Sequence, residues 1–213
     1  MNLSESYKKR LSELAGTKNL FGINVDGLLA IAKGNDYNTF LNKTDALTSK
    51  YNILYRGMQT GDALENDSFM TDYIGHARQY SDDGWVDGIL YNNNDILLFS
   101  DNVFNKLRAQ FKNLKKQDIS KIHSQYIKAD NYPEDIKFVF DFLRSDMPYS
   151  KMQQNFEKNN LLIPIMMQYT LSQNKNILSF LGSDYSDFGG ADEFVVHDIS
   201  KYPTLHNIWE SVN

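Results

Sequence analysis

The chain has 213 residues, of which 41% are hydrophobic, 13% aromatic and 23% charged. A chain of this length and composition can bury the core of one large domain or two small ones, which argues against intrinsic disorder. The absence of cysteine excludes disulfide frameworks, thiolate metal sites and cysteine nucleophiles, and only four histidines remain for imidazole chemistry. A net charge of -5 argues against a protein that binds nucleic acid over its whole surface.

The N-terminal residues carry several charges, and no apolar run approaches the roughly 20 residues that a membrane helix needs. The sequence therefore predicts a soluble protein with no signal peptide and no membrane partner. A cytoplasmic location is expected, in a bacterial or a host cell, although a cysteine-free chain fits an unusual secretion route equally well.

Helical patterns dominate the first fifty residues. Helices are expected before Gly16, over about 25–33 and over about 36–49, because apolar residues recur at helical spacing. Residues 1–50 are predicted to form a helical region packed on the core that follows.

Strand patterns begin in a short β-prone run over 53–57. A second short strand, 68–71, precedes a helix for which Asp72 is the expected N-cap residue. Two more strands are predicted over 84–91 and 95–99, because turn-forming Asp, Gly and Asn residues bound both segments.

A helical block is predicted over about 103–172. Pro133 marks the start of one helix, and apolar positions between 149 and 156 mark one further helix. The run 161–167 is ambiguous between helix and buried strand, because it is continuously apolar and Pro164 interrupts it.

Strand character returns over 177–181 and 193–196, on either side of a loop rich in Gly and Asp at 182–192. Strands on both sides of a helical block predict an α+β domain over 51–213, with its helices at one side of a mostly antiparallel sheet.

Three segments combine a strand with a polar residue that packing alone would not select: Arg56, the turn Ser68 to Asp72, and Glu193. Taken singly, an arginine or a glutamate at a strand end is usually a surface residue or half of an ion pair, and Thr71 with Asp72 is explained as a helix cap.

Together, and in this order, the three segments resemble the Arg-Ser/Thr-Glu branch of the ADP-ribosyltransferase family. The resemblance rests on LYRG at 54–57, SFMTDYIGHARQYS at 68–81 and FGGADEFVV at 188–196. It implies the family's split antiparallel β-sandwich, here with an N-terminal helical region and an inserted helical block, and it implies NAD as substrate.

The same resemblance implies the site residues. Glu193 would stabilise the positive charge that develops on the ribose when the bond between ribose and nicotinamide breaks in NAD. Arg56 would hold the pyrophosphate or the ribose, and Thr71 or Ser68 would supply a hydroxyl that orients Glu193. Further contacts with NAD are expected from Gly57, Tyr80 and Phe188.

The implied function is an NAD-dependent ADP-ribosyltransferase with a macromolecular acceptor, preferably a protein, of the kind used by phages and bacterial effector systems. Ala191 stands where members that modify protein side chains often carry Glu or Gln, so an NAD glycohydrolase is one alternative. The other is a non-catalytic protein that grips a macromolecule through the helical block.

Residues 106–128 hold seven basic side chains and one acid, Asp118. A solvated helix face is the preferred interpretation, and contact with nucleic acid or an acidic partner is the second. Asp184, Asp187, Asp192 and Glu193 offer oxygen ligands but lack a calcium-loop pattern, and the histidines lack metalloprotease spacing, so no metal is expected.

Overall fold

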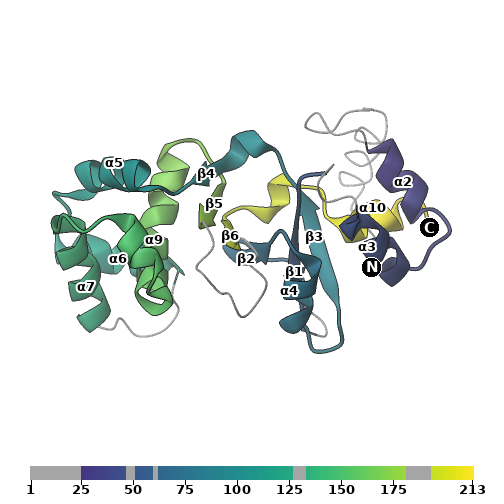
Figure 1. Ribbon diagram of the computed structural model, residues 1–213, viewed down its shortest axis with the longest axis horizontal. Coiled ribbons are helices and arrows are strands. Elements are labelled where there is room, and N and C mark those ends of the chain that lie inside the picture. Colours follow the sequence, from purple (N-terminus) through teal and green to yellow (C-terminus); the bar gives the residue numbers. More distant parts are fainter. Residues whose placement is uncertain (1–24, 47–50, 60–61, 127–132, 181–192) are drawn as a thin grey trace. The chain divides into compact units, whose positions relative to one another are not determined.

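The computed structural model describes residues 25–46, 51–59, 62–126, 133–180 and 193–213 (Figure 1). Within these ranges the chain forms helices, five of them consecutive, and short strands whose pairs are mostly antiparallel, which confirms the α+β class. The helix expected before Gly16 lies outside the described residues.

The chain forms two compact units. Unit 1 comprises residues 1–64, 72–93 and 199–213, and unit 2 comprises residues 65–71 and 94–198. Each unit is thus assembled from segments far apart in the sequence, and the division at residue 50 stays a prediction.

Unit 1 is built on an antiparallel strand pair, β1 (Ile53–Gly57) and β3 (Val86–Leu90), in which Ile53 is opposite Leu90 and Gly57 is opposite Val86. Among the described residues of this unit, four helices accompany it: α2 (Asp26–Ala32), α3 (Tyr37–Asp45), α4 (Ile74–Gln79) and α10 (Leu205–Glu210), with a 3₁₀ turn, η2, at Ile199–Lys201. The strands predicted at 53–57 and 84–91 and the helix predicted at 25–33 are confirmed. The helix predicted over 36–49 is confirmed as far as Asp45, where α3 ends, and residues 47–49 lie outside the described residues.

The core of unit 1 lies where one face of the strand pair meets these helices. Alternate strand residues Ile53, Tyr55 and Leu90 are buried together with Phe40 of α3 and Leu205 of α10. Figure 1 shows α2, α3 and α10 close together, and contacts join each pair of them.

Helix α3 begins where the sequence predicts it. The Asp36 carboxylate accepts a 2.9 Å hydrogen bond from the backbone N–H of Thr39, which satisfies one of the donors left over at a helix start. The predicted N-cap at Asp72 is wrong, however. Helix α4 begins one residue later, because the carbonyl of Tyr73 accepts its first hydrogen bonds, from the N–H groups of His76 and Ala77.

The residues of unit 2 that the structure describes form four strands in the order β2-β6-β5-β4. Their bounds are β2 Ser68–Thr71, β6 Glu193–Val196, β5 Ile177–Phe180 and β4 Ile96–Leu98, preceded by the 3₁₀ turn η1 at Asn93–Asp95. The pair β4 and β5 is parallel, while the other two neighbouring pairs are antiparallel.

The described part of the helical block of unit 2 consists of five helices: α5 (Asp101–Phe111), α6 (Lys116–Tyr126), α7 (Pro133–Arg144), α8 (Tyr149–Gln153) and α9 (Phe156–Ser172). Their apolar faces share one core with Leu178 of β5 and Val195 of β6. The block matches the sequence prediction, and so does the start of α7 at Pro133.

One prediction for the block is wrong, and one that the sequence left open is decided by the structure. The single helix expected across 149–156 is wrong: α8 ends at Gln153, and the Asn155 side chain accepts the Lys158 N–H to start α9. The ambiguous run 161–167 is helical, since it lies inside α9 with Pro164 included.

Within the described ranges, no helix combines the length and the hydropathy required to cross a lipid bilayer.

Candidate functional site

The structure places Thr71 directly opposite Glu193. Strands β2 and β6 run antiparallel with Thr71 paired to Glu193 at one end and Ser68 paired to Val196 at the other. Side chains of directly opposed residues lie on the same face of a sheet, with their Cβ atoms about 5 Å apart. One predicted hydroxyl residue and the predicted catalytic carboxylate are therefore neighbours.

Ser68, the alternative hydroxyl residue, has a different position. It is three residues from Thr71, and since strand side chains alternate between faces, the two lie on opposite faces of β2. Its buried hydroxyl donates to the backbone carbonyl of Glu65. The register thus sets Thr71, rather than Ser68, beside Glu193.

The far end of this strand pair is closed by a second polar pair. Asp67 directly precedes β2 and His197 directly follows β6, and His197 Nδ1 lies 2.6 Å from the Asp67 carboxylate. The backbone N–H of Asp67 also donates to the His197 carbonyl at 3.1 Å. These contacts fix the register that aligns Thr71 with Glu193.

The other predicted residues belong to unit 1. Arg56 and Gly57 lie at the end of β1, where Arg56 is opposite Asp87 of β3. Tyr80 is the C-cap residue of α4, and its side chain is 63% exposed. Its ring contacts the His76 ring edge to face, with 5.1 Å between the ring centroids. Phe188 lies outside the described residues. The predicted site residues are thus divided between the two units.

Gly57 has a packing role that the sequence did not indicate. A Cβ atom at this position would lie 2.0 Å from the Ala77 carbonyl oxygen and 2.9 Å from the carbonyl carbon of Tyr80. Both are backbone atoms that no rotamer change can move. The close approach of α4 to β1 therefore requires glycine at position 57.

A buried polar cluster around Asp87 was missed by the sequence reasoning. One Asp87 carboxylate oxygen accepts three hydrogen bonds, from the Tyr37 hydroxyl at 2.9 Å, the Gly88 N–H at 2.7 Å and the His206 N–H at 3.0 Å. Burial raises the pKa of Asp87, although these hydrogen bonds oppose the rise. An aspartate between buried apolar residues of a strand was the available signal.

Aromatic rings surround this cluster. The Tyr37 ring contacts Trp85 at a centroid distance of 5.1 Å, His206 at 5.0 Å and Trp209 at 5.6 Å. Burial, followed by the nearby Asp87 charge, raises the pKa of the Tyr37 hydroxyl above its ordinary value. Tyr37 therefore stays protonated and acts as a donor to Asp87.

The basic stretch 106–128 divides into exposed lysines and one buried arginine. Exposed side chains are those of Lys106, Lys112, Lys115, Lys116 and Lys121, and Lys128 lies outside the described residues. The Arg108 guanidinium instead lies 4.9 Å from the centroid of the Phe104 ring and 4.7 Å from that of Phe142. Burial lowers its pKa. Arg108 is therefore part of the core of the helical block.

The candidate cation ligands Asp184, Asp187 and Asp192 lie outside the described residues. Among the side chains that the structure does describe, no group of three or more His, Asp or Glu is arranged to hold a metal ion.

Comparisons with family models, with curated proteins and with solved structures found no match to this chain. We therefore infer function from the residues, their geometry and the motif resemblance.

Proposed function

We propose that the protein is an NAD-dependent ADP-ribosyltransferase that transfers ADP-ribose to a macromolecular acceptor, preferably a protein, and that its fold is a variant of the split β-sandwich of that family. The observation that carries the proposal is the register of β2 and β6, which pairs Thr71 with Glu193. These are the hydroxyl and carboxylate that the motif resemblance assigns to catalysis, and they come from segments more than a hundred residues apart.

The chemistry needs few groups. The bond between the ribose C1′ and nicotinamide breaks with its electron pair leaving on nicotinamide, and positive charge develops on the ribose. The Glu193 carboxylate opposes this charge and hydrogen-bonds a ribose hydroxyl, while the Thr71 hydroxyl orients the carboxylate. The acceptor nucleophile then bonds to C1′ and releases its proton to solvent.

The remaining residues bind NAD in this proposal. Arg56 contacts the pyrophosphate, because a guanidinium pairs with two phosphate oxygens at once. The motif resemblance also assigns NAD contacts to Gly57, Tyr80 and Phe188, whereas Ser68 lies on the opposite face of β2 from Thr71. The reaction occurs in the cytoplasm, where NAD is available, of a bacterium or of a host cell that receives an effector.

The test is an assay with NAD labelled in its adenylate half, incubated with the full chain and a cell lysate. Wild-type protein is expected to release nicotinamide and to label a lysate component, and Glu193→Gln is expected to do neither. Glu65→Gln, the same change at an exposed position in unit 2, is the matched control and should behave as wild type. No nicotinamide release by wild type, or equal release by Glu193→Gln, would contradict the proposal.

The assay also separates the two alternatives. Free ADP-ribose with no labelled macromolecule would identify a glycohydrolase, the outcome that Ala191 favours. The exposed lysines of α5 and α6 favour a binding role instead. Lysate binding that survives Glu193→Gln and is lost when Lys112, Lys115 and Lys116 are changed to Glu would identify a non-catalytic binding protein.

A further inference from the structure

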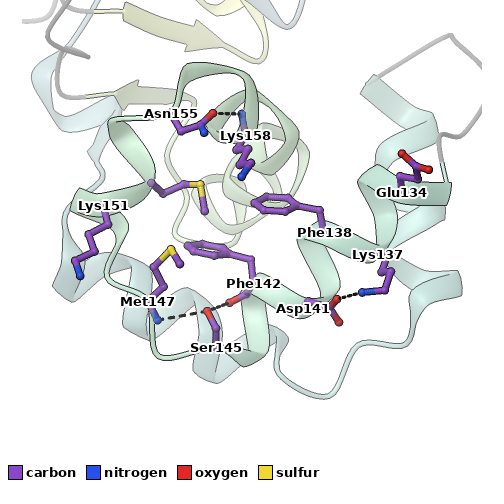
Figure 2. A pocket seen from close by; sticks show the side chains of 11 residues that line it. Glu134, Lys137, Phe138, Asp141, Phe142, Ser145, Met147, Lys151, Asn155 and Lys158 are labelled. Carbon is purple, nitrogen blue, oxygen red and sulfur yellow. Dashed lines mark hydrogen bonds and ion pairs between the residues drawn. The ribbon is translucent and has the colours of Figure 1, made fainter.

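A pocket of about 510 Å³ lies inside the helical block, between α7, α8 and the first turn of α9 (Figure 2). Its volume falls in the range of about 300–1,000 Å³ that is usual for small-molecule sites. All its lining residues lie between 134 and 158. None of them belongs to the proposed transferase site, so this pocket needs an explanation of its own.

The apolar wall consists of two phenylalanines and two methionines. The rings of Phe138 and Phe142 are nearly parallel, with 6.1 Å between centroids and 10° between planes. Met152 is buried and Met147 is 44% exposed. Such a wall suits a flat aromatic body, because rings stack on rings and thioether side chains adapt to the outline of a ligand.

Charged side chains at the rim of the pocket determine where the polar group of a ligand would bind. Lys137 is paired with Asp141 at 2.5 Å, whereas Lys158 places its ammonium group 5.6 Å from the centroid of the Phe138 ring. No ion pair joins Lys158 to any carboxylate among the described side chains. Lys158 is therefore the cation positioned beside the aromatic wall.

Two further features add positive potential at this end. The first turn of the 17-residue helix α9 lies at the pocket, with the Asn155 side chain accepting the Lys158 N–H, and a helix N-terminus favours nearby anions. Lys151 of α8 also lines the rim. Figure 2 shows the acid Glu134 at the opposite end of the pocket from Lys151 and Met147.

We propose that this pocket binds a small organic anion with a flat aromatic body, which lies along Phe138, Phe142 and Met152 while its anionic group pairs with Lys158. The occupant is a free small molecule, because the pocket is concave and of small-molecule size. The inference is independent of the proposed transferase activity.

A matched pair of fluorescent probes tests it. 8-Anilinonaphthalene-1-sulfonate and N-phenyl-1-naphthylamine share one ring system and differ by the sulfonate. Wild type is expected to bind one sulfonate molecule per chain, and Lys158→Met to weaken that binding about tenfold while changing the affinity for the neutral probe less than twofold. The change is tolerated by the fold, because the exposed Lys158 side chain supplies no cap hydrogen bond.

Lys106→Met is the control, since Lys106 is an exposed helical lysine that does not line the pocket. It should bind both probes as wild type does, and so should Glu193→Gln. Binding is located by the NMR signals of the methionine methyl groups. The signals of Met147 and Met152 should shift on titration with the sulfonate.

Three results would overturn the proposal: no saturable binding of the sulfonate, equal affinity in Lys158→Met and wild type, or shifts confined to the other methionines. The probe titration uses no NAD, and the transferase assay uses neither probe. A negative result in the titration therefore leaves the transferase proposal standing, and a negative result in the transferase assay leaves the pocket proposal standing.

Discussion

The Tyr37 hydroxyl donates a 2.9 Å hydrogen bond to the buried carboxylate of Asp87, which also accepts from the backbone N–H of His206. Through these contacts one carboxylate of β3 joins α3 to the first turn of α10. Replacing a buried carboxylate held in this way by a neutral acceptor costs little folding free energy. A buried charge that has lost its hydrogen-bond donors, in contrast, strongly destabilises the fold.

Asp87→Asn and Asp87→Ala should therefore differ. Asparagine keeps one acceptor oxygen, whereas alanine leaves the donors of Tyr37 and His206 buried without an acceptor, so Asp87→Ala should be about 2 kcal/mol less stable than Asp87→Asn. Urea unfolding at pH 7 measures the difference. Equal stability of the two variants would show that these hydrogen bonds contribute nothing.

The stability of wild type relative to Asp87→Asn should also depend on pH. Burial raises the pKa of Asp87 above its ordinary 3.8, so the folded chain keeps this proton at pH values where the unfolded chain has lost it. The contribution of protonated Asp87 to the free energy of unfolding is fully present below about pH 3.8, and it declines as the pH rises through the folded-state pKa. Urea unfolding of both proteins from pH 3.5 to 7 should show this decline, and a difference that grows with pH would contradict it.

Thr71 is expected to act as a positioning residue for Glu193. Thr71→Val keeps the shape of the side chain and removes the hydroxyl, and should lower the rate of nicotinamide release about tenfold, the equivalent of one hydrogen bond of roughly 1.4 kcal/mol. Thr71→Ser restores the hydroxyl and should recover most of the rate. If valine and serine reduce kcat equally, the hydroxyl has no such role.

Gly57→Ala should destabilise unit 1 because its Cβ would collide with the backbone of α4. We expect a loss of about 3 kcal/mol in the free energy of unfolding. Gly84→Ala is the comparison. Gly84 has a φ of 70° with open space around it, so alanine there costs only the backbone strain of about 1 kcal/mol. Thermal unfolding of both variants ranks them, and a smaller loss for Gly57→Ala would contradict the packing described.

Arg108→Lys should not be a conservative change. The planar guanidinium lies against the rings of Phe104 and Phe142 and donates to the Phe142 carbonyl, and a lysine ammonium reproduces neither the planar contact nor its direction. A loss of about 1–2 kcal/mol is expected in urea unfolding. Lys106→Met, a change at an exposed position of the same helix, should stay within about 0.5 kcal/mol of wild type.

Part of the candidate site could be predicted from the sequence and part could not. The residue types of Arg56, Thr71 and Glu193 are visible as local exceptions within strand patterns. Which hydroxyl lies beside Glu193 is decided by the register of two strands about 120 residues apart, and a shift of one residue would reverse the faces. The importance of Asp87 was missed because its donors come from α3 and α10, which sequence distance conceals.

By itself, the sequence determined the α+β class and the positions of most helices and strands, because periodicity is a property of neighbouring residues. Only the tertiary structure decided that residues 199–213 share unit 1 with segments before residue 94, and that Thr71 is opposite Glu193. Each of these depends on contacts between segments distant in the chain, whose free energy is set by burial and pairing rather than by local propensity.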